Sequence, residues 1–597
     1  MVREFSFSFG FRKIDKSKSL DPDRQARPVA RAIALVLAIG GLMSLPAVRL
    51  AQLQLVEGEQ NRERADNNRI RLVPIPSNRG PIFDRNSKYL AGTHLTRSVY
   101  LWPTEQSIQQ WQITAAKLSP ILDIPTAHIL KKLQLATELE ERNVAISQQV
   151  SPDVFIILKE RGAEFPGVEV RAESTRYYPQ GELASHVIGH IGEVTPEEID
   201  ANSEYRLRMK IGKEGVEAAA NDLLLGTWGD RLVEVNAEGQ QLGEIGQHPP
   251  KGGKTVQLTL DLNLQKTAEK ALGPRRGAVV VLNVKTGEVL TMASYPRFDP
   301  NIFTKPVTEA EWEELQGKEN PFVNRALQGY PPGSTFKIVT SVAAMGSGQY
   351  SPYSRVGTYA YIWVGGIRFN EHGGAGYGYI GFREALAYSS NTFFYQVGLG
   401  VGAEDIYKWA RNLGLGGVDL DALRISKSYN GLIPTPKQKE ELYGDYWYAG
   451  DTVNMAIGQG MVLCTPLELA KMAAAIANGG YRVKPHLLAA DTNTPLTAPE
   501  PVGLSPEAVA VIREGMTDVV RYGTASYALT DESLPLTAGK TGTSEAGIGQ
   551  ESHSLYVGFA PANKPEIAIA VVVENGGYGS VTAAPIAKEV YKTYFKK

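Results

Sequence analysis

The 597-residue sequence contains one cysteine and almost no net charge, and both shortages exclude classes of protein. The single Cys464 cannot form an intrachain disulfide or a thiolate cluster, and its place in the apolar run MVLCTP predicts a buried packing role. With 62 Lys and Arg against 64 Asp and Glu, the formal net charge of −2 gives no indication of nucleic-acid binding. The length predicts about two to four domains.

Long uncharged apolar runs are also scarce, and the most informative one is Ala32–Val48, between Arg31 and Arg49. Because arginine side chains can reach the membrane surface, this length is sufficient to cross a bilayer. Basic residues outnumber acidic ones before it, which predicts a cytoplasmic N-terminus and an exported remainder. A cleaved signal peptide is the alternative, but the preceding basic segment is long and no clear cleavage site follows. We therefore expect an uncleaved anchor.

The apolar run, the basic segment before it and one segment rich in turn residues together predict four parts along the chain. Two prolines and two glycines in HPPKGGKTVQLTLD predict a domain boundary near residue 254. The expected parts are a cytoplasmic tail (1–30), a transmembrane helix (31–50), a noncatalytic domain (51–254) and a catalytic domain (255–597). Within 51–254, a polar stalk over Leu50–Arg71 precedes a mixture of short strands and charged helices.

The pattern after residue 254 is mixed α and β. GAVVVLNVKTGEVLTMAS predicts two strands joined as a hairpin at Lys285-Thr286-Gly287. The runs SLYVGFAP and EIAIAVVVENGG predict two more strands, and the last segment predicts a terminal helix. Helix starts with capping residues and Pro at the first position are expected at Thr465 and Ser505. Together these patterns predict an α+β fold with an antiparallel sheet flanked by helices.

The stretch PPGSTFKIV begins a helix on a serine, Ser334, directly after two prolines and a glycine. Lys337 lies three residues later, so its amine can share a helix face with the Ser334 hydroxyl. The apolar residues that follow predict a buried helix, which makes a merely solvated lysine less natural. By itself this pair is weak evidence, because Ser-x-x-Lys also occurs by chance in a chain of this length.

Two further short motifs follow in order, and the three together are strong evidence for a catalytic site built on Ser334. YSSN gives Ser389 and Asn391, and GKTGTS gives Lys540, Thr541, Gly542 and Thr543. A serine at position 389 can relay a proton, and the neighbouring asparagine amide can hold a peptide bond. The lysine of the last motif supplies positive charge for a carboxylate, and its glycine lets a strand approach an extended peptide. The backbone N–H groups of Ser334 and Thr543 are the expected oxyanion donors.

Over nearly its whole length the sequence resembles the class B penicillin-binding proteins, specifically the penicillin-binding protein 2 type that serves cell elongation. The resemblance rests on RGPIFDRNSKYLA, RYYPQGELASHVIGHIGEV and GKEGVEAAANDLLLGTWG in the noncatalytic part. It also rests on DPNIF, NRALQGYPPGSTFK and AIGQGMVLCTPLELAKMAAAIANGG in the catalytic part. It implies an elongated pedestal of the penicillin-binding protein dimerisation type over 51–254 and a serine β-lactamase-like transpeptidase domain over 255–597.

The resemblance also implies the reaction and the partners. The expected enzyme is a single-pass membrane D,D-transpeptidase that cross-links peptidoglycan stem peptides through an acyl-enzyme on Ser334, with Lys337 as base, and that β-lactams acylate. A glycan polymerase of the SEDS class and other elongation-complex membrane proteins are the expected partners, and Arg79 and Asp84 of the pedestal are expected to matter for that complex. No cofactor is implied. Some members hold zinc between the first two motifs, but this chain has only His372 there, so we expect no metal.

Two other classes remain open from the sequence. A hydrolase, either a D,D-carboxypeptidase or a β-lactamase, would use the same serine but pass the acyl group to water. A class A β-lactamase needs a carboxylate after the second motif, and none there lies in a Glu-x-x-Leu-Asn pattern. The carboxylates that follow are Glu404, Asp405, Asp419 and Asp421. A noncatalytic membrane scaffold that regulates a glycan polymerase would keep the fold without the reaction.

Overall fold

A computed structural model of the chain describes residues 22–57, 59, 70–138, 143–147, 150–206, 209–235, 241–305, 307, 309–317, 319–417, 423, 425, 431–489, 497–547 and 549–596. The chain divides into two compact units. One comprises Met1–Pro76 and Trp228–Pro250, and the other comprises Ser77–Thr227 and Lys251–Lys597. Residues 1–21 of the expected tail and residues 58 and 60–69 of the expected stalk lie outside the described residues, while residues 22–30 of that tail are helical.

The first unit contains the predicted apolar helix, α1 (Pro22–Ala51), which continues into a π-helical turn at Gln52–Val56. The segment Ala30–Val56 is long and apolar enough to cross a membrane, and its apolar side chains are exposed to the surroundings of the chain. Exposed leucine and valine on every side of a helix are costly in water, which favours a lipid environment for this helix. The same unit holds an antiparallel sheet in the order β1 (Ile70–Ile75), β8 (Gly229–Val235) and β9 (Gln241–His248).

In the second unit, residues 77–227 and a two-residue strand just after residue 254 form a small mixed layer. Its strands run in the order β10 (Val256–Gln257), β2 (Ile82–Phe83), β3 (Tyr89–Leu101) and β4 (Val144–Ser147), and β5 (Val168–Tyr177) also pairs with β3. The helices are α3 (Ile108–Leu122), α4 (Thr126–Glu138) and α5 (Pro152–Glu160). Trp111, Leu118 and Ile129 of these helices share a buried core with β3. Shorter elements are α6 (Ser185–Ile188), β6 (Ile191–Glu193), α7 (Pro196–Ala201), β7 (Lys210–Gly212), α8 (Gly215–Ala219) and α9 (Asn221–Leu224).

A buried ionic cluster joins the distant segments of this layer. The Glu217 carboxylate on α8 accepts from Arg79 Nε at 2.5 Å, from Arg176 Nε at 2.6 Å and from the Tyr178 hydroxyl at 3.1 Å. Asp84 is also fully buried, and its carboxylate accepts from the backbone N–H of Leu262 at 3.1 Å. Paired and hydrogen-bonded burial of this kind holds chain segments together. Arg79 and Asp84 therefore face the interior, and neither side chain is presented to a partner.

The catalytic half is built on one five-stranded antiparallel sheet. Its order is β12 (Val289–Tyr295), β11 (Gly277–Asn283), β21 (Ile567–Val573), β20 (His553–Ala560) and β19 (Ala538–Ser544). The predicted hairpin of β11 and β12 and the two predicted C-terminal strands are confirmed. Because every residue of β21 is buried, both faces of the sheet must be covered.

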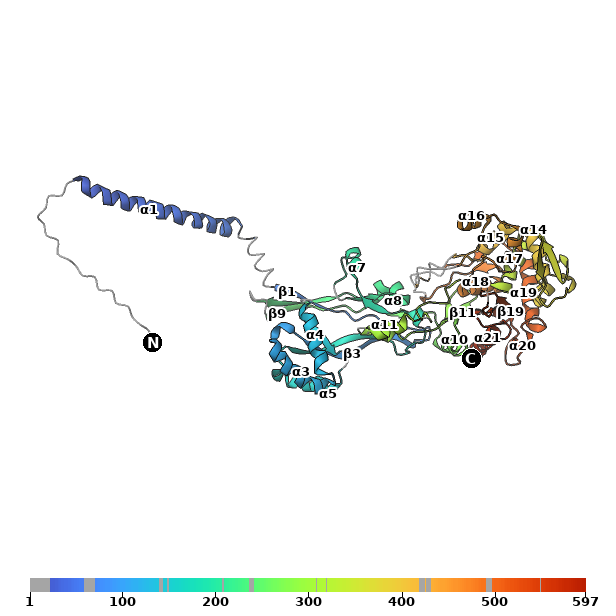
Figure 1. The fold of residues 1–597 in the computed structure, drawn as a ribbon, viewed down its shortest axis with the longest axis horizontal. Coiled ribbons are helices and arrows are strands. Elements are labelled where there is room, and N and C mark those ends of the chain that lie inside the picture. The colour runs from blue at the N-terminus through green and yellow to red at the C-terminus, as the bar shows by residue number, and fades with distance from the viewer. Residues whose placement is uncertain are drawn as a thin grey trace. The chain divides into compact units, whose positions relative to one another are not determined.

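Helices cover the two faces of this sheet, whose strands β11 and β19 are labelled beside α10, α18 and α21 in Figure 1. α10 (Leu262–Leu272) and α21 (Ala583–Phe595) share a core with Val279 and Val281 of β11, while α18 (Pro466–Ala477) shares the opposite core with Val280 and Leu282. The alternation along β11 follows from the two-residue period of a strand. The predicted α+β class is confirmed.

The remaining helices and hairpins carry the segments between the three motifs. The predicted caps are present: Thr465 accepts from Glu468 N before α18, and Ser505 accepts from Ala508 N before α19 (Pro506–Arg521). The other helices are α11 (Glu309–Leu315), α12 (Lys337–Gly346), α13 (Phe382–Tyr388), α14 (Asn391–Val401), α15 (Ala403–Asn412), α16 (Pro436–Tyr443), α17 (Ala449–Ala456) and α20 (Ser526–Leu529). The short strand pairs are β13 (Arg355–Thr358) with β16 (Gly378–Gly381), β14 (Tyr361–Val364) with β15 (Ile367–Asn370), and β17 (Tyr481–Arg482) with β18 (Glu500–Pro501).

Candidate active site

Ser334 lies in a tight 3₁₀ turn, η5 (Gly333–Phe336), that leads directly into α12. Gly333 has φ +52°, and a Cβ there would lie 2.7 Å from the backbone oxygen of Thr543, so the turn requires glycine. The Gly333 N–H also donates to the Gly458 oxygen at 2.9 Å. This turn leaves Ser334 partly accessible, while Lys337 at the start of α12 is fully buried.

The second motif surrounds the Lys337 amine. Lys337 Nζ donates to Asn391 Oδ1 at 2.6 Å, to the Ser389 backbone oxygen at 2.7 Å and to Ser389 Oγ at 3.2 Å. Ser389 ends α13 in the left-handed conformation, with φ +59°, and Asn391 begins α14. In the described part of the chain no hydrogen bond joins Ser334 Oγ to Lys337, because the donors of the amine are used by the second motif. Catalytic hydrogen bonds often form only when substrate is bound.

The third motif lies on β19, which pairs with β20 alone among the described strands and so ends the sheet. An edge strand can pair with an added extended peptide. Lys540 is fully buried and its Nζ donates to the Thr541 backbone oxygen at 3.0 Å. At Gly542 a Cβ would lie 2.9 Å from Thr335 Cγ2 and 3.0 Å from the Pro332 oxygen. This glycine therefore lets β19 pack against the turn that carries Ser334.

Burial tunes both lysines toward the neutral form. Burial lowers the pKa of Lys337 to about 7, although the charge of Glu371 opposes the shift. Burial, and then the charge of Lys337, lower the pKa of Lys540 well below its ordinary value. The pKa of His372 is also lowered, by burial and by both lysine charges. A lysine that is partly neutral near pH 7 can accept a proton from a serine hydroxyl.

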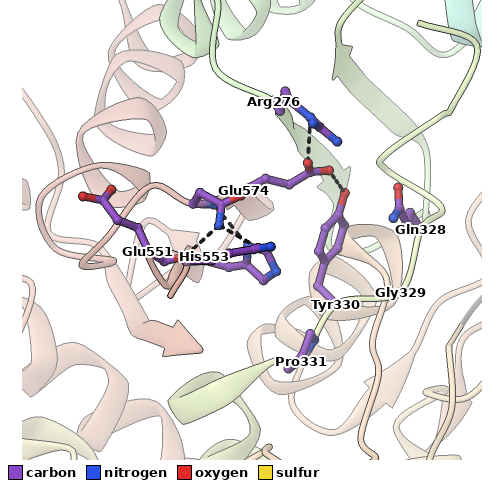
Figure 2. A pocket seen from close by; sticks show the side chains of 10 residues that line it. Arg276, Gln328, Gly329, Tyr330, Pro331, Glu551, His553 and Glu574 are labelled. Carbon is purple, nitrogen blue, oxygen red and sulfur yellow. Dashed lines mark hydrogen bonds and ion pairs between the residues drawn. The ribbon is translucent and has the colours of Figure 1, made fainter. Parts of the chain in front are cut away.

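A polar pocket of about 600 Å³ lies beside the residues that precede the nucleophile turn (Figure 2). Tyr330 and Pro331 line it, and none of the eight motif residues does. In Figure 2 the Tyr330 hydroxyl and Arg276 both point at the Glu574 carboxylate, at 2.8 Å and 2.9 Å. Arg325 Nε also pairs with the Glu574 carboxylate at 2.8 Å, so internal partners occupy this carboxylate.

Two family models divide most of the chain between them. The penicillin binding protein transpeptidase domain matches residues 277–592, and the penicillin-binding protein dimerisation domain matches residues 74–258. The chain belongs to the penicillin-binding proteins. The sequence resemblance is thus confirmed, and the relatives are of the penicillin-binding protein 2 type.

The relatives match this member of the family over nearly its whole length. The peptidoglycan D,D-transpeptidase MrdA of Acinetobacter baumannii is 34% identical, over 91% of this chain and 84% of the relative. The protein of the same name from Escherichia coli K12 is 31% identical, over 92% of each chain. Penicillin-binding protein 2 of Helicobacter pylori, solved in complex with MreC, is 27% identical with a TM-score of 0.80, over 88% of this chain and 99% of that one. A structure of a peptidoglycan synthase complex is 32% identical with a TM-score of 0.72, over 95% and 98%.

The structure brings the predicted residues of this family member into two adjoining groups. Lys337, Ser389 and Asn391 form one hydrogen-bonded cluster, and Lys540–Thr543 lies on the strand packed against the Ser334 turn. Their catalytic roles remain predictions. Sequence reasoning missed Glu371, whose buried carboxylate accepts hydrogen bonds from the second motif. The segment IRFNEHGG carries no local signal that could have identified it.

Among the described residues, no group of three or more His, Cys, Asp or Glu side chains is placed to hold a metal ion. Cys464 is buried, and burial raises the pKa of its thiol well above the ordinary value, so it stays protonated and packs as an apolar group.

Proposed function

We propose that this chain is a membrane-anchored peptidoglycan D,D-transpeptidase whose nucleophile is Ser334. The observation that carries the proposal is the arrangement of Lys337, which is bonded to both residues of the second motif and lies one helical turn after the partly accessible Ser334. The two MrdA relatives are named peptidoglycan D,D-transpeptidases, which supports the substrate class.

In the proposed acylation, Ser334 Oγ attacks the carbonyl carbon of the penultimate D-alanine of a stem peptide. Neutral Lys337 accepts the hydroxyl proton, and the N–H groups of Ser334 and Thr543 stabilise the oxyanion. Ser389 relays the proton to the departing amine, the C–N bond breaks, and D-alanine leaves. The acyl group remains as an ester on Ser334.

Deacylation reverses these proton transfers with a different amine. The amine of a neighbouring stem peptide attacks the ester, its proton passes to the lysine–serine pair, and Ser334 leaves protonated. Before acylation, the terminal carboxylate of the donor binds Lys540, and its negative charge favours the protonated amine despite burial, while Thr541–Thr543 pair with the donor backbone as an added strand. The Asn391 side-chain amide hydrogen-bonds to a peptide group of the donor.

We further propose the division of the chain into a cytoplasmic tail (1–30), a transmembrane helix (31–50), a pedestal (51–254) and a transpeptidase domain (255–597). The apolar segment Ala30–Val56 and the ranges of the two family models support it. The catalytic part acts outside the cytoplasmic membrane, since the basic residues that precede the helix favour a cytoplasmic N-terminus. Relatives have been solved in complex with MreC and in a peptidoglycan synthase complex that coordinates polymerization and crosslinking, which supports protein partners for this chain. A SEDS-class glycan polymerase and other elongation-complex membrane proteins are the partners that we propose.

Turnover of stem peptides by the purified full-length protein tests the proposal against its two rivals. A transpeptidase releases D-alanine and joins the donor to an added acceptor amine. A carboxypeptidase releases the same D-alanine but gives only the shortened peptide. A noncatalytic scaffold gives neither product, and either of these last two results would overturn the proposal.

A further inference from the structure

The buried carboxylate of Glu371 accepts hydrogen bonds from residues in and beside the second motif. Glu371 is 4% exposed and follows β15 directly. One carboxylate oxygen accepts from the N–H of His372 at 2.8 Å and of Asn391 at 2.5 Å. The other accepts from Ser390 Oγ at 2.6 Å and from Thr392 at 3.0 Å (N–H) and 2.6 Å (Oγ1). The Glu371 carboxylate thus accepts five hydrogen bonds, an uncommonly large number for a residue that lies outside all three motifs.

The bonds of Glu371 fix the residue that holds the proposed base. Ser390 is the N-cap of α14, so the carboxylate lies at the positive end of that helix and binds its first free N–H groups. Asn391 is the first residue of the helix, and its Oδ1 accepts from Lys337 Nζ at 2.6 Å. Asn391 Nδ2 in turn donates to the Asn370 oxygen at 3.3 Å, at the end of β15. A continuous path therefore runs from Glu371 through Asn391 to Lys337.

We propose that Glu371 is a positioning residue for acyl transfer, which fixes the Ser-x-Asn motif around Lys337 and, by its charge, sets the pH at which Lys337 becomes a competent base. The inference rests on the proposed function of Lys337. Glu371 itself does not touch the reacting atoms.

The charges around Lys337 support this balance. Burial favours neutral Lys337, and the negative charge of Glu371 acts in the opposite direction. Lys540 on β19 and His372 are the other titratable groups that interact with these two, and both are driven toward their neutral forms by burial. Tyr377 and Tyr395 face Glu371, and burial and then its charge raise the pKa of each phenol, that of Tyr395 to about 12. Glu371 is thus the group that opposes full neutralisation of Lys337.

The test is the pH dependence of Ser334 acylation by a fluorescent penicillin in the full-length protein. Glu371→Gln keeps the size of the side chain, and its amide can still donate to the Ser390 and Thr392 hydroxyls. Without the negative charge the Lys337 ammonium is less stable, so its pKa falls. The acidic limb of the acylation profile should move to lower pH by about one unit, with a reduced maximal rate.

Ser390→Ala is the matched control, because it removes one bond to Glu371 and leaves the charge in place. Its maximal rate should fall while its acidic limb stays at the pH of the wild type. An unmoved limb in Glu371→Gln, or an equal shift in Ser390→Ala, would overturn the inference. If Glu371→Gln does not fold, Glu371→Asp provides the test, because it keeps the negative charge on a shorter side chain. The acidic limb of its acylation profile should then stay at the pH of the wild type. A shifted limb would contradict the inference. Failure of the proposed function is distinguishable: a noncatalytic scaffold is not acylated at all, whereas a hydrolase is acylated but gives no cross-linked product in the stem-peptide assay.

Discussion

Lys337 Nζ lies 2.6 Å from Asn391 Oδ1, although 54 residues separate the two in the chain. The contact requires α12 and α14 to pack side by side, which they do through a shared apolar core. A lysine in such a core is costly when charged, and the asparagine and serine oxygens supply the acceptors that make its burial tolerable. The same burial makes the lysine a base near neutral pH.

The first prediction concerns pH. Burial lowers the pKa of Lys337 to about 7, so Lys337 is protonated below that pH and unable to accept the Ser334 proton. The second-order rate constant for acylation by penicillin should therefore rise with pH, with a midpoint near 7, and fall about tenfold per pH unit on the acidic side. Fluorescent-penicillin labelling from about pH 5 to pH 9 measures it. A rate that does not change across this range would exclude Lys337 as the base.

Gly542 gives the second prediction. A Cβ at this position would meet the Pro332 oxygen at 3.0 Å and Leu555 Cβ at 3.1 Å, so Gly542→Ala should push β19 from the Ser334 turn. Because small displacements of reacting groups are expensive, acylation should slow by about tenfold to a hundredfold. Gly162→Ala is the matched control, since nothing lies within 4 Å of its added Cβ. Equal labelling rates in the two variants would show that the close contact does not matter.

The three motifs and their order could be predicted from sequence because each keeps its chemistry in a few adjacent residues. The antiparallel sheet could be predicted as well, since β20 and β21 are continuous apolar runs bounded by turn residues. Glu371 could not, because its importance lies in five bonds that exist only after β15 is folded against α14. Likewise, sequence spacing placed the Lys337 amine near Ser334, but tertiary contacts direct it to the second motif instead.

Arg79 and Asp84 show a different limit of sequence reasoning. The pedestal motif that contains them suggested partner contacts, but both side chains are buried and bonded internally. A short polar motif does not reveal whether its charges face solvent or a buried partner. Replacing either residue would therefore test folding rather than assembly.

The third prediction follows from the buried cluster of Glu217. Glu217→Gln leaves Arg79 and Arg176 buried without their carboxylate, which should destabilise this part of the chain by about 3–5 kcal/mol. Although burial raises the pKa of Glu217, the charges and hydrogen bonds of the two arginines outweigh it and hold the pKa below its ordinary value. The stabilisation is therefore complete at neutral pH and is lost as the pH falls through that lowered pKa.

Thermal unfolding of the full-length protein at neutral and acidic pH measures this difference. The control is Glu160→Gln, an exposed carboxylate in the same layer, which should leave the midpoint unchanged. Equal midpoints for Glu217→Gln and the wild type at neutral pH would contradict a structural role for the cluster.

The fourth prediction concerns the N-terminal helix. Because Ala30–Val56 is apolar and exposed, the full-length protein should require detergent for extraction, and a variant that lacks residues 1–56 should not. N-terminal sequencing of the mature protein should begin at or near Met1. A sequence that begins beyond Val48 would identify a cleaved signal peptide and contradict the anchor.

The last prediction separates the transpeptidase from a β-lactamase, since both acylate through a serine and differ in the next step. A lactamase holds a carboxylate that activates water behind the ester. Glu404 is exposed in the first turn of α15 and Asp405 follows it there, while Asp419 and Asp421 lie outside the described residues. Because no carboxylate after the second motif lies in the Glu-x-x-Leu-Asn pattern of such a base, the penicilloyl ester on Ser334 should persist for many minutes. Intact-mass spectrometry should show one added penicilloyl group in the wild type and in Ser347→Ala, and none in Ser334→Ala. Rapid return of the unmodified mass, with many equivalents of penicillin hydrolysed, would favour the lactamase instead.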